Sequence, residues 1–189
     1  MTAQIPDQFK YEGEAFDLVG ISGGSLYEPQ DFGITPKMAS TACWRGYQLF
    51  YDCKDNQLVL DHMYVRTDDK VKVNDIAPKE TGEKDEMVFF NTFYENLDLK
   101  TKFTGSMLLA KDFISEMYVH MGFQSPESYR TVLEIHVEDG DITEVKDLSD
   151  EMEERRKLGR VAPSRPETLE EPDIGDWVRD RFSLDYESE

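Results

Sequence analysis

A chain of 189 residues and 21.9 kDa is the length of one domain, and a domain of this size buries roughly 70% of its unfolded surface, so it needs no disulfide or metal to hold a core. Hydrophobic residues at 39% and aromatic residues at 12% exclude a wholly disordered chain. With 40 acidic and 21 basic side chains, the formal net charge of −19 disfavours nucleic acid and anionic membranes as partners, because both require a basic surface.

The N-terminal part of the chain is typical of strands followed by a long loop. Residues 9–21 alternate apolar and polar side chains on either side of Gly13, which predicts two short strands. Residues 22–39 contain the glycines and prolines of a loop, together with several large apolar side chains. We therefore expect this loop to pack across a barrel mouth or a sheet edge.

The clearest hairpin lies in the middle of the chain. Residues 41–53 are apolar on both faces, which predicts an interior strand, and Asp55-Asn56 then forms the turn. In the returning strand, residues 57–66, alternation places one set of side chains on a common face: Leu58, Leu60, His62 and Tyr64. This placement predicts that His62 is a core or interface histidine.

Three elements are predicted between residues 87 and 121. Residues 87–97 and 103–110 have the composition of strands, and Gly105 in the second permits a bulge or a close backbone approach. Residues 112–121 fit alternation in part, but the spacing of their apolar side chains favours a helix of two to three turns.

A second hairpin and a helix follow. Asp139-Gly140 is a strong turn signal between residues 130–137 and 142–148, which alternate as strands do. A helix then begins at Ser149, with acidic residues in its first turn and basic residues in its last, and it ends at Gly159.

These elements predict a mainly β (α+β) fold, an antiparallel meander closed as a barrel or stacked as a two-sheet sandwich, with one or two short helices. Residues 1–158 form the β-rich domain, and residues 159–172 form a proline-containing linker. Residues 173–189 carry apolar side chains at the spacing of an amphipathic helix. We expect this C-terminal helix to dock on the body of the chain or on a second copy, in which case the protein is a homodimer.

Two cysteines and the absence of targeting signals indicate the compartment. No basic N-terminal stretch precedes an apolar run, and no window approaches about 18 apolar residues, so we expect neither a secretory signal nor a membrane span. Cys43 and Cys53 fall in one predicted strand, about 33 Å long, which keeps them too far apart for a disulfide. Two unpaired thiols are typical of the reducing cytoplasm.

The chain lacks the common catalytic signatures. No phosphate-binding glycine loop, zinc-ligand pair or nucleophile elbow is present, so we expect no cofactor and no metal. The polar face of the predicted helix is the best local candidate: Glu116 would stand one turn before His120 and orient it as a general base, next to Tyr118. A solvated polar stripe is the alternative interpretation.

Arg45 is a second candidate. It lies next to Trp44 in a predicted apolar strand, where an unpaired cation is costly, so it must meet a ligand anion, a core carboxylate or solvent. A third cluster alternates along one strand face, Glu134, His136 and Glu138, and it could hold a metal ion. A solvent-facing polar stripe explains that spacing equally well, and we favour it.

Four sequence blocks resemble those of a bacterial protein family to which no activity is assigned. The blocks are residues 42–47 (ACWRGY), 103–113 (FTGSMLLAKDF), 118–123 (YVHMGF) and 176–186 (DWVRDRFSLDY). The resemblance extends over most of the chain, so it implies a bacterial source and a C-terminal segment that belongs to the domain. It implies no site residue.

The charge distribution provides the main functional hypothesis. Residues 137–189 hold 18 acidic and 8 basic side chains. We expect a non-enzymatic binding protein that engages a basic protein partner, for instance as an inhibitor or immunity-type protein. The alternative is a small-ligand-binding β-barrel, and even an enzyme, with a pocket around Trp44, Arg45, Tyr118 and His120. A soluble, highly charged protein without a basic partner also fits this composition.

Overall fold

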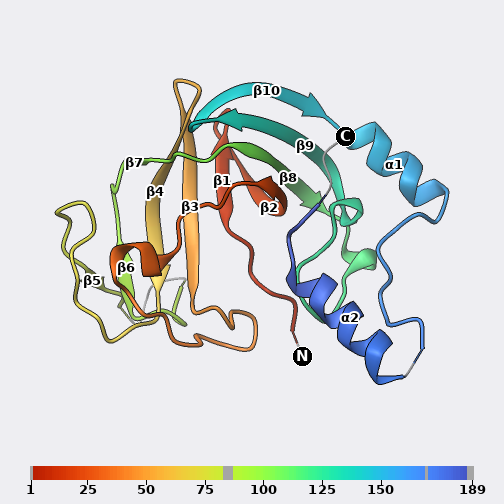
Figure 1. The fold of residues 1–189 in the computed structure, drawn as a ribbon, viewed down its shortest axis with the longest axis horizontal. Coiled ribbons are helices and arrows are strands. Elements are labelled where there is room, and N and C mark those ends of the chain that lie inside the picture. Colours follow the sequence, from red (N-terminus) through yellow and green to blue (C-terminus); the bar gives the residue numbers. More distant parts are fainter. Residues whose placement is uncertain (1, 83–86, 169, 187–189) are drawn as a thin grey trace.

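The computed structural model describes residues 2–82, 87–168 and 170–186. Within them, ten strands form one sheet (Figure 1), with the bounds β1 (Gln8–Tyr11), β2 (Glu14–Gly23), β3 (Tyr47–Lys54), β4 (Gln57–Val65), β5 (Lys79–Glu80), β6 (Thr92–Tyr94), β7 (Leu99–Lys100), β8 (Gly105–Phe113), β9 (Tyr129–Glu138) and β10 (Asp141–Asp147). The α-helices are α1 (Ser149–Lys157) and α2 (Glu171–Phe182), and the 3₁₀ turns are η1 (Pro29–Phe32), η2 (Ser115–Met117) and η3 (Pro126–Ser128).

The sheet closes on itself as a ring. Its strand order is β10-β9-β8-β2-β1-β3-β4-β6-β5, β7 pairs with β4, and β10 returns to β4 through the pair Asp141 and Gln57. Among the named strands, β1 and β3 are parallel and the other pairs are antiparallel. The predicted mainly β, barrel-like fold is confirmed, although the parallel pair departs from a simple meander.

Apolar side chains fill the inside of the ring. Phe9 of β1 stacks on Tyr51 of β3 with 4.7 Å between the ring centroids, and both rings are buried. Leu49, Leu60 and Leu109, from three further positions on the sheet, are fully buried in the same cluster. Each such side chain stabilises the fold by roughly 1.5–3 kcal/mol. The packed interior leaves the outside of the ring as the place for a binding surface.

A bulge in β4 changes which of its side chains face this core. Phe50 pairs with His62, but the next residue of β3, Tyr51, pairs with Leu60, so Asp61 is an extra residue in β4. One added residue reverses the alternation, because successive side chains in a strand point to opposite faces. Leu60 therefore faces the core, whereas His62 and Tyr64 face outward and lie outside the core cluster. The prediction that these side chains share a face was wrong.

The strand predicted over residues 41–53 begins only at Tyr47, so the placement of Trp44 and Arg45 within it was wrong. Gly46 has a φ of 79°, and a Cβ there would lie 2.0 Å from the carbonyl oxygen of Lys37. This close approach of another loop requires a turn immediately before the strand. Both cysteines are free thiols, but the prediction that they share one strand was wrong, because Cys43 precedes β3.

Two other predicted elements also differ. The strand over residues 87–97 shrinks to β6, with a turn at residues 87–89 before it. The helix over residues 112–121 was wrong: β8 extends to Phe113, which pairs with Tyr129 of β9, and only the single turn η2 follows. Pairing with the long strand β9 outweighs the weak helical spacing of ten residues.

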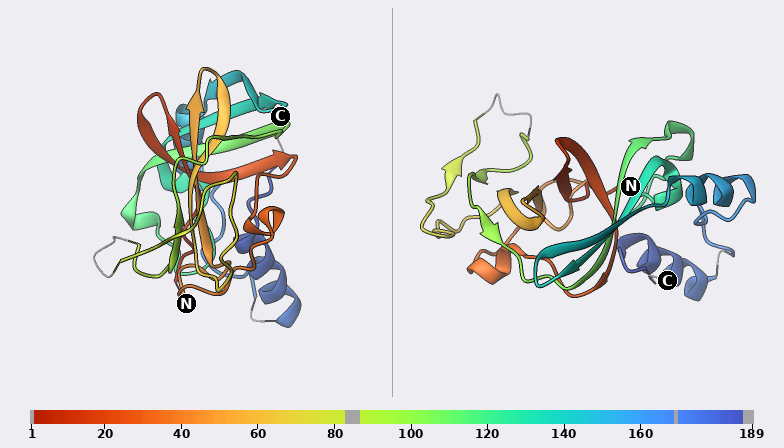
Figure 2. Two further views of the ribbon diagram at one scale, coloured as in Figure 1. Left: turned by 90° about the vertical axis from the view of Figure 1, so that its left-hand side faces the viewer. Right: turned by 90° about the horizontal axis from the view of Figure 1, so that it is seen from above.

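The two α-helices lie on one outer side of the ring, while β5 and β6 lie at the opposite end, as Figure 1 and the right-hand view of Figure 2 show. Beneath them a second apolar cluster forms on the outer face of β2, β8 and β9, and its members are Val19, Leu108, Ala110, Tyr129, Val132, Leu148, Met152 and Tyr186. Met152 is the buried residue of α1, whose remaining side chains face solvent or lie at its edge. The molecule thus has one covered outer face and one without helices.

The C-terminal segment contacts the body of its own chain. Ile21 N donates a hydrogen bond to Leu184 O at 2.7 Å, so the segment adds to the edge of β2. A Cβ on Gly20 would lie 2.9 Å from the ring of Tyr186, and one on Gly122 would lie 2.1 Å from the carbonyl oxygen of Arg181. Two glycines therefore provide the space in which this segment lies.

Candidate functional site

The predicted candidate Arg45 is paired within the protein. Its Nη2 and Nη1 donate to the Asp7 carboxylate at 2.6 and 2.9 Å, and its guanidinium lies over the ring of Tyr47 at 4.6 Å. Asp7 also accepts a hydrogen bond from Leu49 N at 2.7 Å. This bidentate pair joins the N-terminal segment to the start of β3. Pairing with a core carboxylate, one of the roles that the sequence left open, is the role that these contacts describe.

The other predicted residues surround the same N-terminal segment. Trp44 stacks on Phe182 of α2 with 5.0 Å between centroids, and Tyr118 Oη accepts a hydrogen bond from Ala3 N at 3.3 Å. His120 lies edge-on to Tyr118 and is exposed.

Glu116 is exposed on η2 rather than on a helical stripe. Glu116 and Tyr118 line an open groove of about 790 Å³ together with residues 161–167. Trp44, Arg45 and His120 do not line this groove. The five predicted residues therefore do not form one site. Arg45 is paired with Asp7, and Trp44 stacks on α2. The other three residues are exposed.

A different constellation lies on the outer face of β3, β4 and β6. Four half-buried rings form a continuous row, which we call the aromatic strip: Phe50, His62, Tyr64 and Phe93. Phe50 stacks on His62 at 4.2 Å, and Tyr64 stacks on Phe93 at 4.4 Å. His62 joins the two pairs, because its ring lies edge-on to Tyr64 at 6.2 Å and to Phe93 at 5.9 Å.

Strand register produces this row. The pairs Phe50 with His62 and Tyr64 with Phe93 are direct neighbours across β3, β4 and β6, and cross-strand aromatic neighbours interact favourably. The extra residue Asp61 turns the two β4 rings outward. None of the four rings belongs to the buried clusters. The strip is thus an apolar surface built on a rigid sheet.

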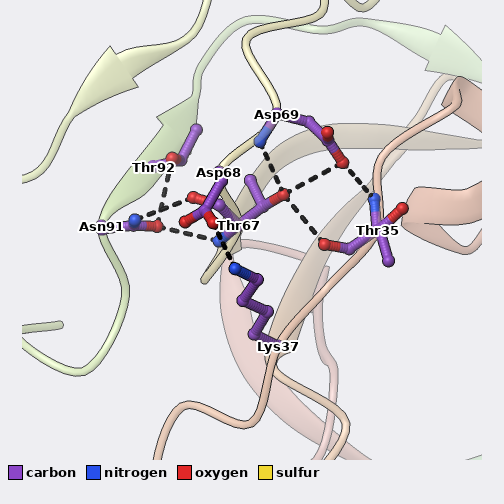
Figure 3. A network of polar contacts seen from close by, with 7 residues as sticks. All are labelled: Thr35, Lys37, Thr67, Asp68, Asp69, Asn91 and Thr92. Carbon is purple, nitrogen blue, oxygen red and sulfur yellow. Dashed lines mark hydrogen bonds and ion pairs between the residues drawn. The ribbon is translucent and has the colours of Figure 1, made fainter.

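A network of polar side chains holds β6 against β4, as Figure 3 shows. The side-chain amide of Asn91 accepts from Thr67 N at 2.9 Å through Oδ1 and donates to Thr67 O at 2.8 Å through Nδ2. Thr67 Oγ1 in turn donates to Thr35 O, and the Asp69 carboxylate accepts from Thr35 N at 2.7 Å. These bonds fix the start of β6, and with it the position of Phe93 on Tyr64.

Both ends of the strip carry further features. Next to Tyr64, whose ring lies 6.0 Å from that of Phe90, the loop before β6 exposes Val88 by 57% and Phe89 by 42%. At the other end, a pocket of about 330 Å³ is lined in part by Phe50, His62 and two carboxylates, Asp52 and Asp61. The strip therefore runs from an exposed apolar loop to an acidic pocket.

The two carboxylates of this pocket differ in their partners. Partial burial raises the pKa of Asp61, but hydrogen bonds from His62 and Lys54 lower it more, so the pKa lies below its usual value and Asp61 is ionised at neutral pH. Within the described part of the chain, Asp52 forms no ion pair, and Lys10 is its register neighbour on β1. Asp52 is thus the carboxylate of this pocket without an ion pair, and Lys10 lines the same pocket opposite it.

Sequence reasoning placed all four strip residues in predicted strands but did not identify the strip. The signal that could have found it is the aromatic content of residues 87–94 together with that of residues 57–66. Comparison with known proteins adds no assignment, since no family model, no curated protein and no solved structure matches the chain.

The described residues contain neither a metal-ligand cluster nor a helix that could span a membrane. In residues 2–82, 87–168 and 170–186, no three histidine, cysteine, aspartate or glutamate side chains are grouped so that they could hold a metal ion. Glu134, His136 and Glu138, considered above as metal ligands, therefore do not form such a group. In the same part of the chain, no helix has the length and apolar character needed to cross a membrane.

Proposed function

We propose that the protein is a non-enzymatic binding protein that holds an arginine- or lysine-bearing segment of a basic protein on the aromatic strip. The observation that carries the proposal is the row of four half-buried outward-facing rings, Phe50, His62, Tyr64 and Phe93, which ends at an acidic pocket. In known protein–protein interfaces, aromatic side chains lie at the centre and charged side chains at the rim. The aromatic strip, with the carboxylates of the pocket at its end, has this arrangement.

Ring faces and carboxylates together favour a cation with an apolar stem. A guanidinium stacks on aromatic rings, and each such contact contributes about 0.5–1 kcal/mol at an exposed site. Asp52 at the end of the strip supplies a carboxylate for the same side chain. The net charge of −19 attracts a basic partner at long range and repels an acidic one.

This chemistry supports an inhibitor or immunity-type role, in which an acidic protein neutralises a basic one, in the reducing cytoplasm that two free thiols fit. The alternative function, a ligand pocket around Trp44, Arg45, Tyr118 and His120, has less support. Asp7 already neutralises Arg45, and residues 2–7 occupy the space between the other side chains.

The experiment that tests the proposal is an NMR titration of the full chain with a capped peptide of alternating arginine and glycine. We expect amide shifts confined to β3, β4, β6 and the loop that carries Phe89. The double variant Tyr64→Ala, Phe93→Ala should abolish them, whereas the control Met38→Ala, Leu158→Ala, which removes two exposed apolar side chains elsewhere, should not.

Salt and charge reversal complete the experiment. Raising the salt from about 50 mM to about 500 mM should weaken the binding, because exposed charges are screened over a shorter distance. A matched peptide of glutamate and glycine should cause no shifts. Shifts that spread over the acidic C-terminal half and survive the double variant would contradict the proposal, since binding would then depend on charge alone.

A further inference from the structure

The covered outer face of the ring contains a cavity that the strip does not involve. This cavity, which we call the Glu134 pocket, has a volume of about 400 Å³ and lies between the sheet, α1, η3, the linker and the C-terminal segment. Its lining includes Leu108, Glu127, Glu134, Lys146, Met152 and Tyr186. A volume of this size lies within the range of small-molecule sites.

The acidic and basic side chains that line this pocket differ in how deeply they are buried. The side chains of Glu134 and Glu127 are only 7% and 10% exposed, whereas those of Lys146 and Arg155 are 40% and 44% exposed. The buried charges are thus carboxylates, and the cations stand nearer the solvent. Carboxylates in a low-dielectric interior interact more strongly with a cation than the same groups in water.

Glu134 retains capacity for a further donor. Burial raises the pKa of Tyr186, so its phenol stays protonated and donates to Glu134 Oε1 at 3.1 Å. His136 Nε2 lies 3.0 Å from Oε2, and Lys146 Nζ, at 3.7 Å, is beyond hydrogen-bond distance. A carboxylate has about four acceptor positions, so these contacts leave room for the N–H groups of a ligand.

Among the described residues, Arg155 forms the ion pair with Glu127, and Arg181 interacts with the same carboxylate electrostatically. Its Oε1 lies 3.4 Å from Arg155 Nη1, and the Arg155 guanidinium is also paired with Glu151 at 2.8 Å. Because Arg155 has this second, closer carboxylate, a ligand cation can take its place on Glu127 without leaving Arg155 unpaired.

The remaining lining is apolar. Leu108 of β8 and Met152 of α1 belong to the second buried cluster, and Leu148 packs against it. Leucine and methionine side chains accept an aliphatic or aromatic body, and methionine adapts its shape to the one it meets. The pocket therefore offers a wall for an apolar group next to two buried carboxylates.

We propose that the Glu134 pocket binds a small organic ammonium ion with an apolar body, the ammonium on Glu134 and Glu127 and the body against Leu108 and Met152. This inference is independent of the proposed function, since it concerns another face of the ring and another class of partner. The exposed cations Lys146 and Arg155 stand where the carboxylate of a zwitterionic ligand would lie, at the solvent side of the pocket.

The test is a titration of the full chain with 2-phenylethylammonium, with the NMR signal of the Met152 methyl group as the readout. The variant Met152→Leu lacks this signal and so identifies it. We expect a saturable shift of this signal. Glu134→Gln keeps an acceptor for Tyr186 but removes the charge, and it should weaken binding at least about tenfold. Glu138→Gln, an exposed change on the same strand, should have no effect.

Further arms make the result decisive. Glu127→Gln repeats the loss through the second carboxylate, so the test does not depend on the stability of one variant. The anion 3-phenylpropionate, of the same shape, should not bind. Binding of the anion as tightly as the ammonium, unchanged affinity in both glutamine variants, or no saturable shift would each overturn the proposal.

Discussion

At the scale of single residues, one inserted aspartate decides what the outer surface of the sheet presents. Asp61 is the extra residue of the β4 bulge, and from that point on the side chains of β4 change face. Met63 and Val65 are thereby fully buried, and His62 and Tyr64 join the aromatic strip. A bulge is therefore as important for this surface as the identity of the rings it turns outward.

Burial also determines the chemistry of the two thiols. Burial, with a smaller contribution from Asp52, raises the pKa of Cys53 to about 12, and burial raises the pKa of Cys43. Both groups are therefore thiols and not thiolates at neutral pH, and only a thiolate reacts readily. We expect slow labelling by iodoacetamide at pH 8 and rapid labelling of both cysteines in urea. Mass spectrometry measures the extent of labelling over time. Rapid labelling of the native protein would contradict the expectation that both thiols are unreactive.

Tyr47 provides a prediction at alkaline pH. Burial raises its pKa from 10.0 to about 12, since it outweighs the opposing effect of Arg45. The folded state thus keeps a proton that the unfolded state loses, so this contribution to stability is complete below pH 10 and is lost as the pH rises toward 12.

Urea unfolding at several pH values between 9 and 12 measures this loss, and one proton contributes a slope of at most about 1.4 kcal/mol per pH unit. The variant Tyr47→Phe should show a shallower decline than the parent protein. An unchanged slope would show that the Tyr47 hydroxyl titrates normally.

At the scale of elements, the C-terminal helix depends on a glycine in the body of the chain. Gly122 has a φ of 67°, and a Cβ there would lie 2.1 Å from the Arg181 carbonyl oxygen. Gly122→Ala should therefore release α2 and lower the free energy of unfolding by about 1–3 kcal/mol. Gly159 is a matched control, because it has the same φ of 67° but no neighbour within 4 Å of the added Cβ.

Hydrogen exchange of α2 distinguishes the two effects. Gly159→Ala carries only the backbone strain and should leave the protection of α2 unchanged, whereas Gly122→Ala should reduce it. Equal exchange in both variants would mean that the helix does not depend on this close approach.

The elements that sequence reasoning predicted correctly are those whose cause is local. The hairpins at Asp55-Asn56 and Asp139-Gly140 form because these residues tolerate the positive φ that the turns require. The helix predicted over residues 112–121 failed because β8 continues there to pair with β9, a strand more distant in the chain. Alternation likewise cannot reveal the insertion of Asp61, which is visible only when β3 and β4 are paired.

The candidate site was predictable only in part for the same reason. His62 was expected in a core or an interface, but its neighbour Phe93 is joined to it by a pairing of β4 with β6 that no local pattern encodes. Arg45 was expected to need an anion, and the residue that pairs with it, Asp7, lies 38 positions away. Long-range contacts decide both outcomes.

At the scale of the whole molecule, the closed sheet separates two outer faces. One is covered by α1, α2 and the C-terminal segment, and it holds the Glu134 pocket. The other, on β3, β4 and β6, carries the aromatic strip, and α1 and α2 lie away from these strands (Figure 1). A net charge of −19 surrounds both, and its field reaches about 8 Å beyond the surface at physiological salt.

The most direct test of the proposed binding surface is photo-crosslinking in living cells that produce the protein. The crosslinking amino acid p-benzoylphenylalanine would replace Phe93 on the strip or Phe113, an exposed ring on β8, in separate variants. We predict that a basic protein is crosslinked from position 93 and not from position 113, and that adding Tyr64→Ala removes the product. Equal products from both positions, or an acidic partner at position 93, would contradict the proposal.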